Sequence, residues 1–311
     1  MTRETMVFHS QFDKLEIWRG FLEAELPDLA VRRADEIDDP ASVRYSLVWK
    51  PPHGFFADYP SLSLVVNLGA GVDALVGRTD LPDVPITRLS DPEMARMMAG
   101  YVLFAVLRYA RDIHIFERAQ RERRWHYIHP RGPETTRVGV LGLGELGAAA
   151  ALELARQGFD VAGWSRTRKN LDGIACMAGP DELPDFLARS DILVVMLPLT
   201  PETDGLLDAR HLALLPPGAK LINVSRGAVV DEAAMIAALT DGSIAEATLD
   251  VFEREPLSPD NPLWAMGNVL ITPHLASVAI PKSAARQIAE NIRRIRSGRE
   301  VLHRVDPRRG Y

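Results

Sequence analysis

The chain has 311 residues, of which 47% are hydrophobic and 25% charged, and its formal net charge is −6. This composition is typical of a globular protein, and the length favours two domains over one. The acidic balance argues against nucleic acid as the main partner, and the apolar runs are too short to span a membrane. The single cysteine and the lack of a signal-peptide core at the N-terminus predict a cytoplasmic protein without a disulfide, and no residue spacing suggests a metal site.

The first hundred residues show a weak β/α pattern. Short strands are predicted at residues 5–8, 45–49, 64–66 and 86–87. A helix is predicted at residues 12–25, and its apolar side chains fall mostly on one face: Phe12, Leu15, Ile17, Phe21 and Leu22. Residues 92–124 follow an Asp91-Pro92 helix start and contain no further proline, so they predict one long helix.

From residue 138 onward the chain alternates short apolar runs with helical segments, as buried parallel strands do. Strands are predicted at 138–141, 160–164, 192–197, 220–224, 247–251 and 269–272, and helices at 145–157, 181–188 and 231–239. A last amphipathic helix, 282–297, is expected to return to the first domain. The predicted fold is α/β with two domains: a Rossmann-type doubly wound parallel sheet at 99–281 and a smaller flavodoxin-like β/α domain formed by 1–98 and 282–311.

A glycine-rich turn marks the start of the larger domain. The apolar run 138–141 leads into Gly142-Leu143-Gly144-Glu145-Leu146-Gly147, which opens an alanine-rich helix. Gly142 permits a tight turn, Gly144 lets a phosphate approach the backbone, and Gly147 lets the helix pack on the strand. This strand–turn–helix context predicts a dinucleotide site.

The end of the next strand indicates which dinucleotide is bound. NAD-selective sites place an acid there for the ribose 2′-hydroxyl, whereas this chain has Ser165 followed by Arg166, Arg168 and Lys169. A planar guanidinium can bind a phosphate in a fork, so Arg166 is the best candidate ligand for a 2′-phosphate, with Arg168 and Lys169 in support. We therefore predict that NADPH is preferred, with NADH possible.

Three polar groups follow the last three predicted strands. They are Arg226 in Val224-Ser225-Arg226-Gly227, Glu255 in the segment that begins with Asp250, and His274 after Thr272-Pro273. The carboxyl ends of parallel strands line the ligand crevice, so a cation, a carboxylate and an imidazole should converge there. Hydride reduction of a carbonyl needs such a set, with a proton donor and a cation for a substrate anion.

These motifs resemble the D-isomer specific 2-hydroxyacid dehydrogenase family, most closely its glyoxylate/hydroxypyruvate reductase branch. The likeness covers nearly the whole chain and is strongest over residues 138–289. It implies that Arg226 binds the substrate's carboxylate and carbonyl oxygen, that His274 is the general acid, and that Glu255 pairs with it. The predicted reaction is NADPH-dependent reduction of a small 2-oxo acid to the D-2-hydroxy acid.

The resemblance also implies contacts in the first domain. The turn in Asn67-Leu68-Gly69-Ala70-Gly71 matches the element whose N–H groups bind the substrate carboxylate, with Ala70 and Gly71 as donors. Trp49 matches an aromatic residue that flanks a small substrate. Trp125 resembles a tryptophan that some relatives lend to a neighbouring subunit, which implies a homodimer.

The full set of expected cofactor contacts is Gly142, Gly144, Glu145, Leu146, Gly147, Ser165, Arg166, Lys169, Leu197, Pro198, Thr203, Val224, Ser225 and Asp250.

Two other functions remain open at this point. Some members of the superfamily are cofactor-sensing scaffolds, against which the Arg226, Glu255 and His274 set argues. An NAD-linked dehydrogenase for a larger hydroxy acid is the second alternative, and Ser165 and Trp49 argue against it.

Overall fold

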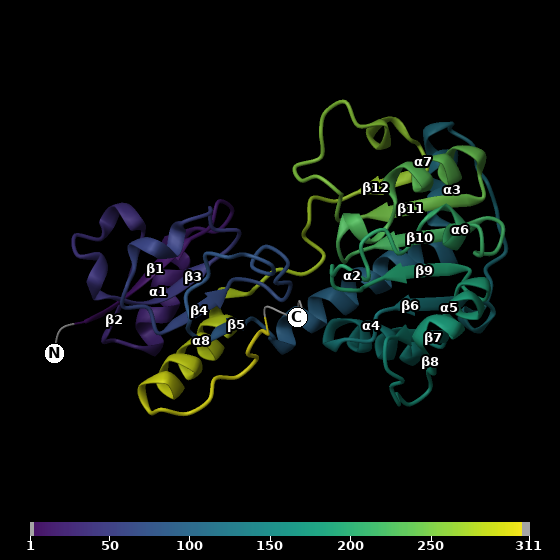
Figure 1. The fold of residues 1–311 in the computed structure, drawn as a ribbon. Coiled ribbons are helices and arrows are strands. Elements are labelled where there is room, and N and C mark those ends of the chain that lie inside the picture. The colour runs from purple at the N-terminus through teal and green to yellow at the C-terminus, as the bar shows by residue number, and fades with distance from the viewer. Residues whose placement is uncertain (1–2, 307–311) are drawn as a thin grey trace. The chain divides into compact units, whose positions relative to one another are not determined.

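The computed structural model of the chain describes residues 3–306. The chain forms two compact units: one runs to Met94 and resumes at Val278, and the other spans Ala95–Ser277 (Figure 1). Each unit is built on one parallel β-sheet, so the predicted two-domain α/β class is confirmed. The predicted domain changes lie after residues 98 and 281. Residues 1–2 and 307–311, which were predicted to belong to the first domain, lie outside the described part.

The smaller unit contains a five-stranded sheet in the order β2-β1-β3-β4-β5, which is the flavodoxin-like order. The structure adds β2 to the predicted strands, because four residues after a turn carry too short a pattern to be recognised. Its strands are β1 (Glu4–His9), β2 (Leu29–Arg32), β3 (Val43–Val48), β4 (Leu64–Asn67) and β5 (Ile86–Arg88). Its helices are α1 (Leu15–Glu25), α8 (Pro281–Arg296) and the short η1 (Ala34–Glu36), η2 (Pro40–Ser42) and η3 (Phe55–Asp58).

The buried face of α1 differs from the predicted one. Leu15, Trp18 and Leu22 are buried, whereas Ile17 and Phe21 are exposed. The spacing of three and four residues that joins the buried side chains is the correct helical stripe. Phe12, which we expected on this face, precedes the helix and is also exposed.

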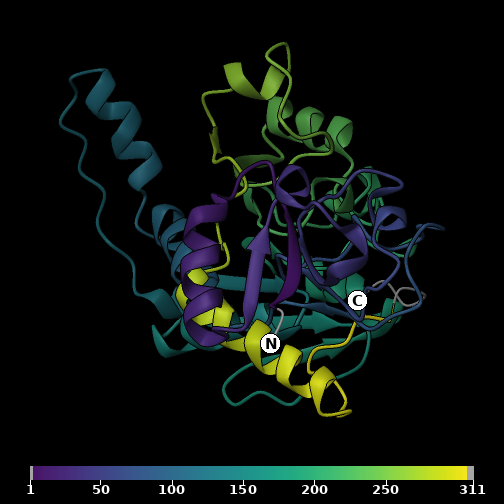
Figure 2. The ribbon, with the colours of Figure 1, turned by 90° about the vertical axis from the view of Figure 1, so that its left-hand side faces the viewer.

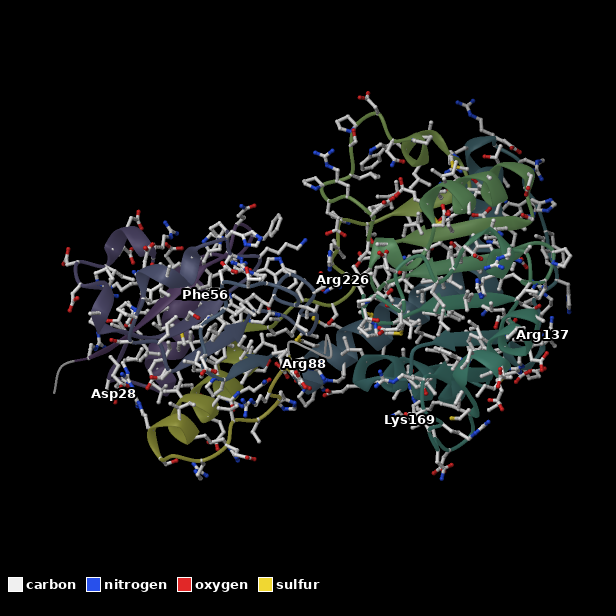
Figure 3. All side chains as sticks on the ribbon, viewed as in Figure 1. Asp28, Phe56, Arg88, Arg137, Lys169 and Arg226 are labelled. Atoms are coloured by element: carbon white, nitrogen blue, oxygen red, sulfur yellow. The ribbon has the colours of Figure 1, made fainter. Side chains whose placement is uncertain are left out.

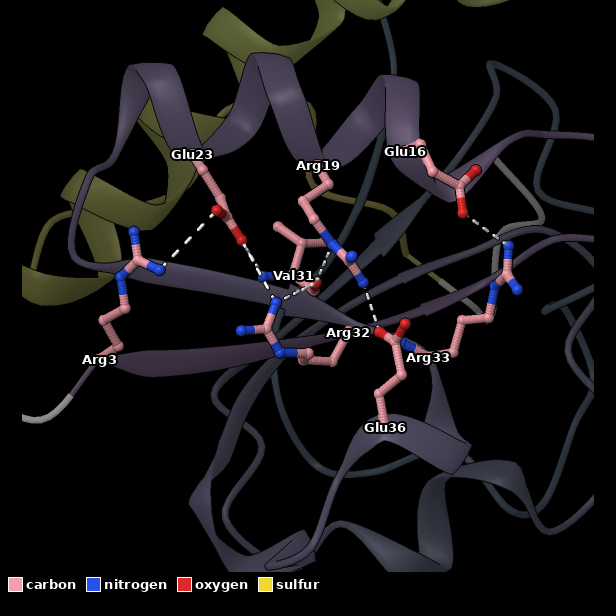
Figure 4. A network of polar contacts seen from close by, with 8 residues as sticks. All are labelled: Arg3, Glu16, Arg19, Glu23, Val31, Arg32, Arg33 and Glu36. Carbon is pink, nitrogen blue, oxygen red and sulfur yellow. Dashed lines mark hydrogen bonds and ion pairs between the residues drawn. The ribbon is translucent and has the colours of Figure 1, made fainter.

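Side chains of α1 cover the outer edge of β2 (Figure 4). Arg19 Nε donates to the Val31 carbonyl at 2.8 Å, and the Val31 N–H donates to Glu23 at 3.1 Å. Arg19 also pairs with Glu36. An edge strand with unpaired backbone groups is a template for association with other chains. These contacts pair the outward backbone groups of Val31.

The larger unit contains a seven-stranded sheet in the order β12-β11-β10-β9-β6-β7-β8. Six of its strands were predicted, and the seventh, β8, was missed because Ala175–Ala178 is a half-exposed edge strand without a continuous apolar run. The strands are β6 (Arg137–Leu141), β7 (Asp160–Ser165), β8 (Ala175–Ala178), β9 (Ile192–Val195), β10 (Ala219–Asn223), β11 (Ile244–Leu249) and β12 (Val269–Ile271). The helices after β6 are α4 (Glu145–Arg156), α5 (Gly179–Ala188), α6 (Ala209–Leu212) and α7 (Glu232–Asp241); the short turns are η4 (Pro133–Thr135), η5 (Gly227–Val229) and η6 (Pro262–Ala265).

The two faces of this sheet have separate cores. Apolar side chains of α5, α6 and α7 pack on one face, among them Phe186, Leu212 and Leu239. Side chains of α2 (Pro92–Ala110) and α4, such as Val106 and Leu154, pack on the other. Helices on both faces of a parallel sheet define the doubly wound arrangement that was predicted. No helix in the described range 3–306 is long and apolar enough to cross a bilayer.

The predicted single helix over residues 92–124 is wrong. The segment forms α2 (Pro92–Ala110) and α3 (Ile113–Arg121), which are separated at Asp112. Asp112 has a left-handed backbone with φ 55°, and its carboxylate accepts a hydrogen bond from Arg131 at 3.2 Å. Aspartate tolerates this conformation better than most residues. The break is accompanied by a contact to a residue 19 positions away, which helical periodicity does not reveal.

Candidate active site

Strands β10, β11 and β12 end side by side. Asn223 pairs with Leu249, and Leu249 pairs with Ile271, and each is the last residue of its strand. The chain segments that follow these residues therefore leave the sheet at one edge. They carry Arg226, Glu255 and His274, so the strand register brings the three predicted catalytic segments to one edge of the larger unit.

His274 and Glu255 form a direct pair. His274 Nδ1 lies 2.8 Å from Glu255 Oε2, and the two side chains are 30% and 22% exposed. The other Glu255 oxygen accepts a hydrogen bond from the Phe252 N–H at 3.2 Å, which fixes the carboxylate. A carboxylate on Nδ1 fixes the orientation of the ring and leaves Nε2 as the nitrogen that could exchange a proton with a substrate.

The loop that carries His274 is held by Asp250. His274 has a left-handed backbone, φ 56°, which is unusual for a residue with a side chain. Its N–H donates to the Asp250 carbonyl at 2.8 Å, and the N–H groups of Leu275 and Ala276 each donate to the Asp250 carboxylate at 2.9 Å. Asp250 was expected to contact the cofactor. Its observed contacts show that it fixes the histidine loop, and its contact with the cofactor stays a prediction.

A half-buried chain of hydroxyl groups extends from Asp250 to helix α2. Thr272 Oγ1 donates to Asp250 Oδ1 at 2.6 Å, and Tyr101 Oη lies 2.6 Å from Thr272 Oγ1. Burial raises the pKa of Tyr101, so the phenol keeps its proton and can donate a hydrogen bond to Thr272 Oγ1. The chain therefore links the histidine loop to a helix on the adjoining face of the same unit.

Arg226 follows β10 and is positioned by Asn223. The buried Asn223 side chain accepts from the N–H and hydroxyl of Ser225 and donates to the Arg226 carbonyl at 3.1 Å. Arg226 Nη1 donates to the Ser225 carbonyl at 2.6 Å. A β-carbon on Gly227 would lie 1.8 Å from the Phe252 backbone, so the Arg226 turn packs directly on the segment that leads to Glu255. Val224 and Ser225, two expected cofactor contacts, are buried in this turn.

The glycine turn lies at the same edge of the sheet. Gly142 follows β6 and has φ 116°, a conformation that favours glycine. Gly147 lies close to Gly142, and a β-carbon added to Gly147 would lie 1.8 Å from the Gly142 carbonyl oxygen. Gly144, by contrast, is exposed at the start of α4, and a β-carbon added to it would meet nothing within 4 Å. Glu145 beside it is also exposed. The half-buried Leu146 follows in the first turn. An open glycine at a helix N-terminus suits the approach of a pyrophosphate.

The polar residues at and after the end of β7 differ in burial and in hydrogen bonding. Ser165 is buried and donates to the Thr167 carbonyl at 2.8 Å, while Arg166 and Lys169 are exposed. Arg168 donates to the Cys176 carbonyl at 2.6 Å and pairs with Glu182, so its guanidinium stabilises β8 and α5. These contacts occupy the Arg168 guanidinium, which was predicted as a supporting anion ligand. Figure 3 shows Lys169 at the outer border of the larger unit.

The loop after β9 is closed by its own hydroxyl groups. Thr203 Oγ1 donates to the Pro198 carbonyl at 2.6 Å and accepts from the Thr200 N–H at 2.8 Å, and Leu197 anchors the loop in the core. Hydrogen bonding from Thr200, with a contribution from the charge of Arg166, lowers the pKa of Glu202. The electrostatic effect of Arg166 therefore reaches this loop, which was expected to contact the cofactor.

The predicted carboxylate-binding turn lies after β4 in the smaller unit. The buried Asn67 side chain donates to the carbonyls of Gly69 and Gly71 at 3.0 and 2.8 Å. Within the described residues, the N–H groups of Ala70 and Gly71 have no protein acceptor. The half-buried Trp49 packs against Gly69, whose β-carbon would lie 2.5 Å from the indole. The turn thus presents two backbone donors beside an aromatic ring, as an oxyanion site requires.

Three organising residues were not predicted as site residues: Asn67, Asn223 and Tyr101. Each asparagine is a buried polar residue that ends an apolar strand, and this pattern is visible in the sequence. A buried amide must be hydrogen-bonded, so it marks a loop whose geometry matters. Tyr101 carried no comparable signal, because its partner Thr272 is 171 positions away.

Comparison with known families agrees with this geometry. Residues 103–276 match the family model described as D-isomer specific 2-hydroxyacid dehydrogenase, NAD binding domain. The chain belongs to this family and is an NAD(P)-dependent oxidoreductase.

Two curated relatives indicate the branch. Glyoxylate/hydroxypyruvate reductase A of Yersinia enterocolitica is 38% identical over 98% of this chain and 99% of its own length. The protein of the same name from Serratia proteamaculans is 40% identical over the same shares. The predicted membership of this branch is confirmed.

Two solved structures have the same fold. A D-isomer specific 2-hydroxyacid dehydrogenase from Xanthobacter autotrophicus, in complex with NADPH and MES, is 67% identical with a TM-score of 0.95, and the match covers 99% of each chain. An NADPH-dependent glyoxylate/hydroxypyruvate reductase from Sinorhizobium meliloti, in complex with NADP and sulfate, is 33% identical with a TM-score of 0.93, again over 99% of each chain.

The two glycines of the turn should respond differently to alanine. Gly147→Ala should lower the free energy of unfolding by about 1–3 kcal/mol, because the added methyl group meets the Gly142 carbonyl. Gly144→Ala should leave thermal unfolding nearly unchanged but weaken dinucleotide binding roughly tenfold, because its methyl group enters open space where phosphate would approach. Thermal unfolding and fluorescence titration measure both. A Gly147→Ala protein as stable as the wild type would contradict this account.

Proposed function

We propose that the protein reduces a small 2-oxo acid, such as glyoxylate or hydroxypyruvate, to the D-2-hydroxy acid with NADPH. The observation that carries the proposal is the His274–Glu255 pair, with Nδ1 and Oε2 2.8 Å apart, on the sheet edge that also carries Arg226 and the glycine turn. The names of the relatives from Yersinia and Serratia support the substrate class.

The residues of the glycine turn fit a dinucleotide. Gly142 and Gly147 permit close packing of β6 against α4, and the open Gly144 leaves the helix N-terminus accessible to the pyrophosphate. Ser165 in place of an acid removes the repulsion that a 2′-phosphate would meet, and Arg166 supplies a cation there. NADP(H) in the Xanthobacter and Sinorhizobium structures supports the same preference here.

The chain's own groups divide the remaining chemistry. When bound, the reduced nicotinamide supplies the hydride that the keto carbon receives. Arg226 and the N–H groups of Ala70 and Gly71 hold the substrate carboxylate, and Arg226 also polarises the carbonyl. His274 Nε2 gives its proton to the developing alkoxide, and Glu255 stabilises the imidazolium before transfer.

We also propose that the protein is a cytoplasmic homodimer. Trp125 and Tyr127 follow α3 and are 97% and 74% exposed, which is unusual for large aromatic side chains. Figure 2 shows α3 and the extended segment after it projecting from the larger unit. A second copy is the partner that would cover these side chains. The single cysteine is consistent with a reducing compartment.

Replacement of His274 tests the proton donor. His274→Ala should lower kcat by roughly 10²–10⁴-fold, while the Kd for NADPH stays within about twofold, because only proton transfer is lost. His211→Ala is a matched control, since His211 forms a similar 2.8 Å pair with Asp208 elsewhere in the unit and should keep full activity. Wild-type reduction should also slow toward alkaline pH. Turnover by His274→Ala at the wild-type rate would refute the assignment.

Replacement of Arg166 tests the cofactor preference. Arg166→Ala should raise the Kd for NADPH roughly 10–100-fold and that for NADH by no more than about twofold, because only NADPH carries the 2′-phosphate. Arg156→Ala, which removes another exposed arginine, is the control and should change neither constant. Equal losses of affinity for the two cofactors would show that Arg166 does not bind the 2′-phosphate of NADPH.

Sedimentation tests the dimer. At micromolar protein concentration, sedimentation should give a molecular mass about twice that of the 34.4 kDa chain. If Trp125 enters the neighbouring active site, Trp125→Ala should lower kcat/KM while the dimer persists. A wild-type species with the mass of one chain would exclude the homodimer.

A further inference from the structure

A buried arginine in the smaller unit binds the loop that follows Trp49. The Arg78 side chain is 7% exposed. Its Nη1 donates to the Pro51 carbonyl at 2.7 Å, and its Nη2 donates to the Pro52 carbonyl at 2.9 Å. The guanidinium carbon also lies 5.7 Å from the centre of the Phe56 ring. One side chain therefore holds two successive carbonyl groups of this loop.

Asp80 completes the arrangement, which we name the Arg78–Asp80 clamp. Arg78 Nε and Nη2 donate to the two oxygens of Asp80 at 2.8 and 2.6 Å, a bidentate ion pair. Asp80 Oδ2 also accepts from the Gly54 N–H at 2.7 Å. Arg78 and the Gly54 N–H hold the pKa of the Asp80 carboxyl below its usual range, so the pair stays ionised. His53, the exposed residue before Gly54, lies 3.7 Å from Asp80.

The clamped loop needs external support to hold its shape. Lys50 and Gly54 both have left-handed backbones, with φ 46° and 82°, and they bracket Pro51, Pro52 and His53. A left-handed lysine is strained and persists only where the surroundings hold it. The clamp supplies hydrogen bonds at Pro51, Pro52 and Gly54, which lie between or at these two bends.

The loop and the carboxylate-binding turn are joined through Trp49. The Trp49 indole packs on Gly69, the residue before Ala70 and Gly71. Arg78 and Asp80 in turn belong to the segment that leaves this turn. The clamp thus joins the two chain segments that follow this contact: the loop after Trp49 and the segment after the carboxylate-binding turn.

We propose that Arg78 is a positioning residue that sets substrate size, because it holds Trp49 against the carboxylate-binding turn. This inference rests on the proposed function, in which the turn binds the carboxylate, and on the predicted place of Trp49 beside the rest of a small 2-oxo acid. A fixed indole leaves room for a small substituent and excludes a larger one. A loosened indole widens this space and weakens the hold on the small substrate.

The test is the ratio of kcat/KM for glyoxylate to kcat/KM for 2-oxobutanoate. In Arg78→Met this ratio should fall at least tenfold, mainly through a higher KM for glyoxylate, while the KM for NADPH stays within twofold. Both values of kcat/KM scale with the concentration of folded enzyme, so partial unfolding cancels in the ratio. A purely structural role for Arg78 would leave the ratio unchanged.

Two variants and a control sharpen the test. Arg78→Lys keeps the charge but not the planar fork, and Asp80→Asn keeps the shape but not the ion pair; each should lower the ratio less than Arg78→Met does. They also keep the inference testable if Arg78→Met does not fold. Arg19→Met is the control, because Arg19 likewise binds a backbone carbonyl and a carboxylate in the same unit, but at the β2 edge. Its ratio should equal that of the wild type.

The outcomes separate this inference from the proposed function. If the wild type reduces glyoxylate but the Arg78 and Asp80 variants keep its ratio, the positioning role is overturned and the proposed function stands. If the Arg19 control lowers the ratio as much as Arg78→Met, the specific role of the clamp is also overturned. If the wild type reduces no 2-oxo acid, the proposed function fails and this inference fails with it.

Discussion

The geometry of His274, the proposed proton donor, depends on one buried carboxylate. Asp250 is 1% exposed, and a charge so deeply buried is stable only when hydrogen bonds surround it. Its partners are the Thr272 hydroxyl and the N–H groups of Leu275 and Ala276, which all belong to the loop around His274. The charge therefore dictates the path of that loop, including the left-handed backbone at His274, and the resulting path allows Nδ1 to meet Glu255.

Buried polar side chains also hold the loops that follow two other strands. Asn223 ties Ser225 and Arg226 to the end of β10, and Asn67 ties Gly69 and Gly71 to the end of β4. In each case a polar side chain at the buried end of a strand has to find partners in the next few residues. Strand register sets where each loop begins, and the buried polar residue sets how it turns. The apolar core thereby determines the positions of groups that it never touches.

This division explains how much could be predicted from the sequence. The glycine turn, most strands and the segments that bear Arg226, Glu255 and His274 were recognisable, because their signals are local: apolar runs, glycine spacing and polar residues after strands. The edge strand β8, the break at Asp112 and the Tyr101–Thr272 contact were not. Asp112 turns where Arg131 binds it, and Tyr101 meets a residue 171 positions away, so these features arise only in the folded chain.

The acidic character of the chain constrains how it can recognise anionic ligands. With a net charge of −6, the protein as a whole repels a 2-oxo acid and a phosphorylated dinucleotide. Attraction must therefore be local and directional. In the proposed function, the N–H groups of Ala70 and Gly71 and the N-terminus of α4 would bind anions through dipoles, which add no net charge. Full positive charges would then be needed only where a particular anion is distinguished: Arg226 for the substrate carboxylate and Arg166 for the 2′-phosphate. Selectivity thus depends on a few placed cations, while general affinity for anions comes from the backbone.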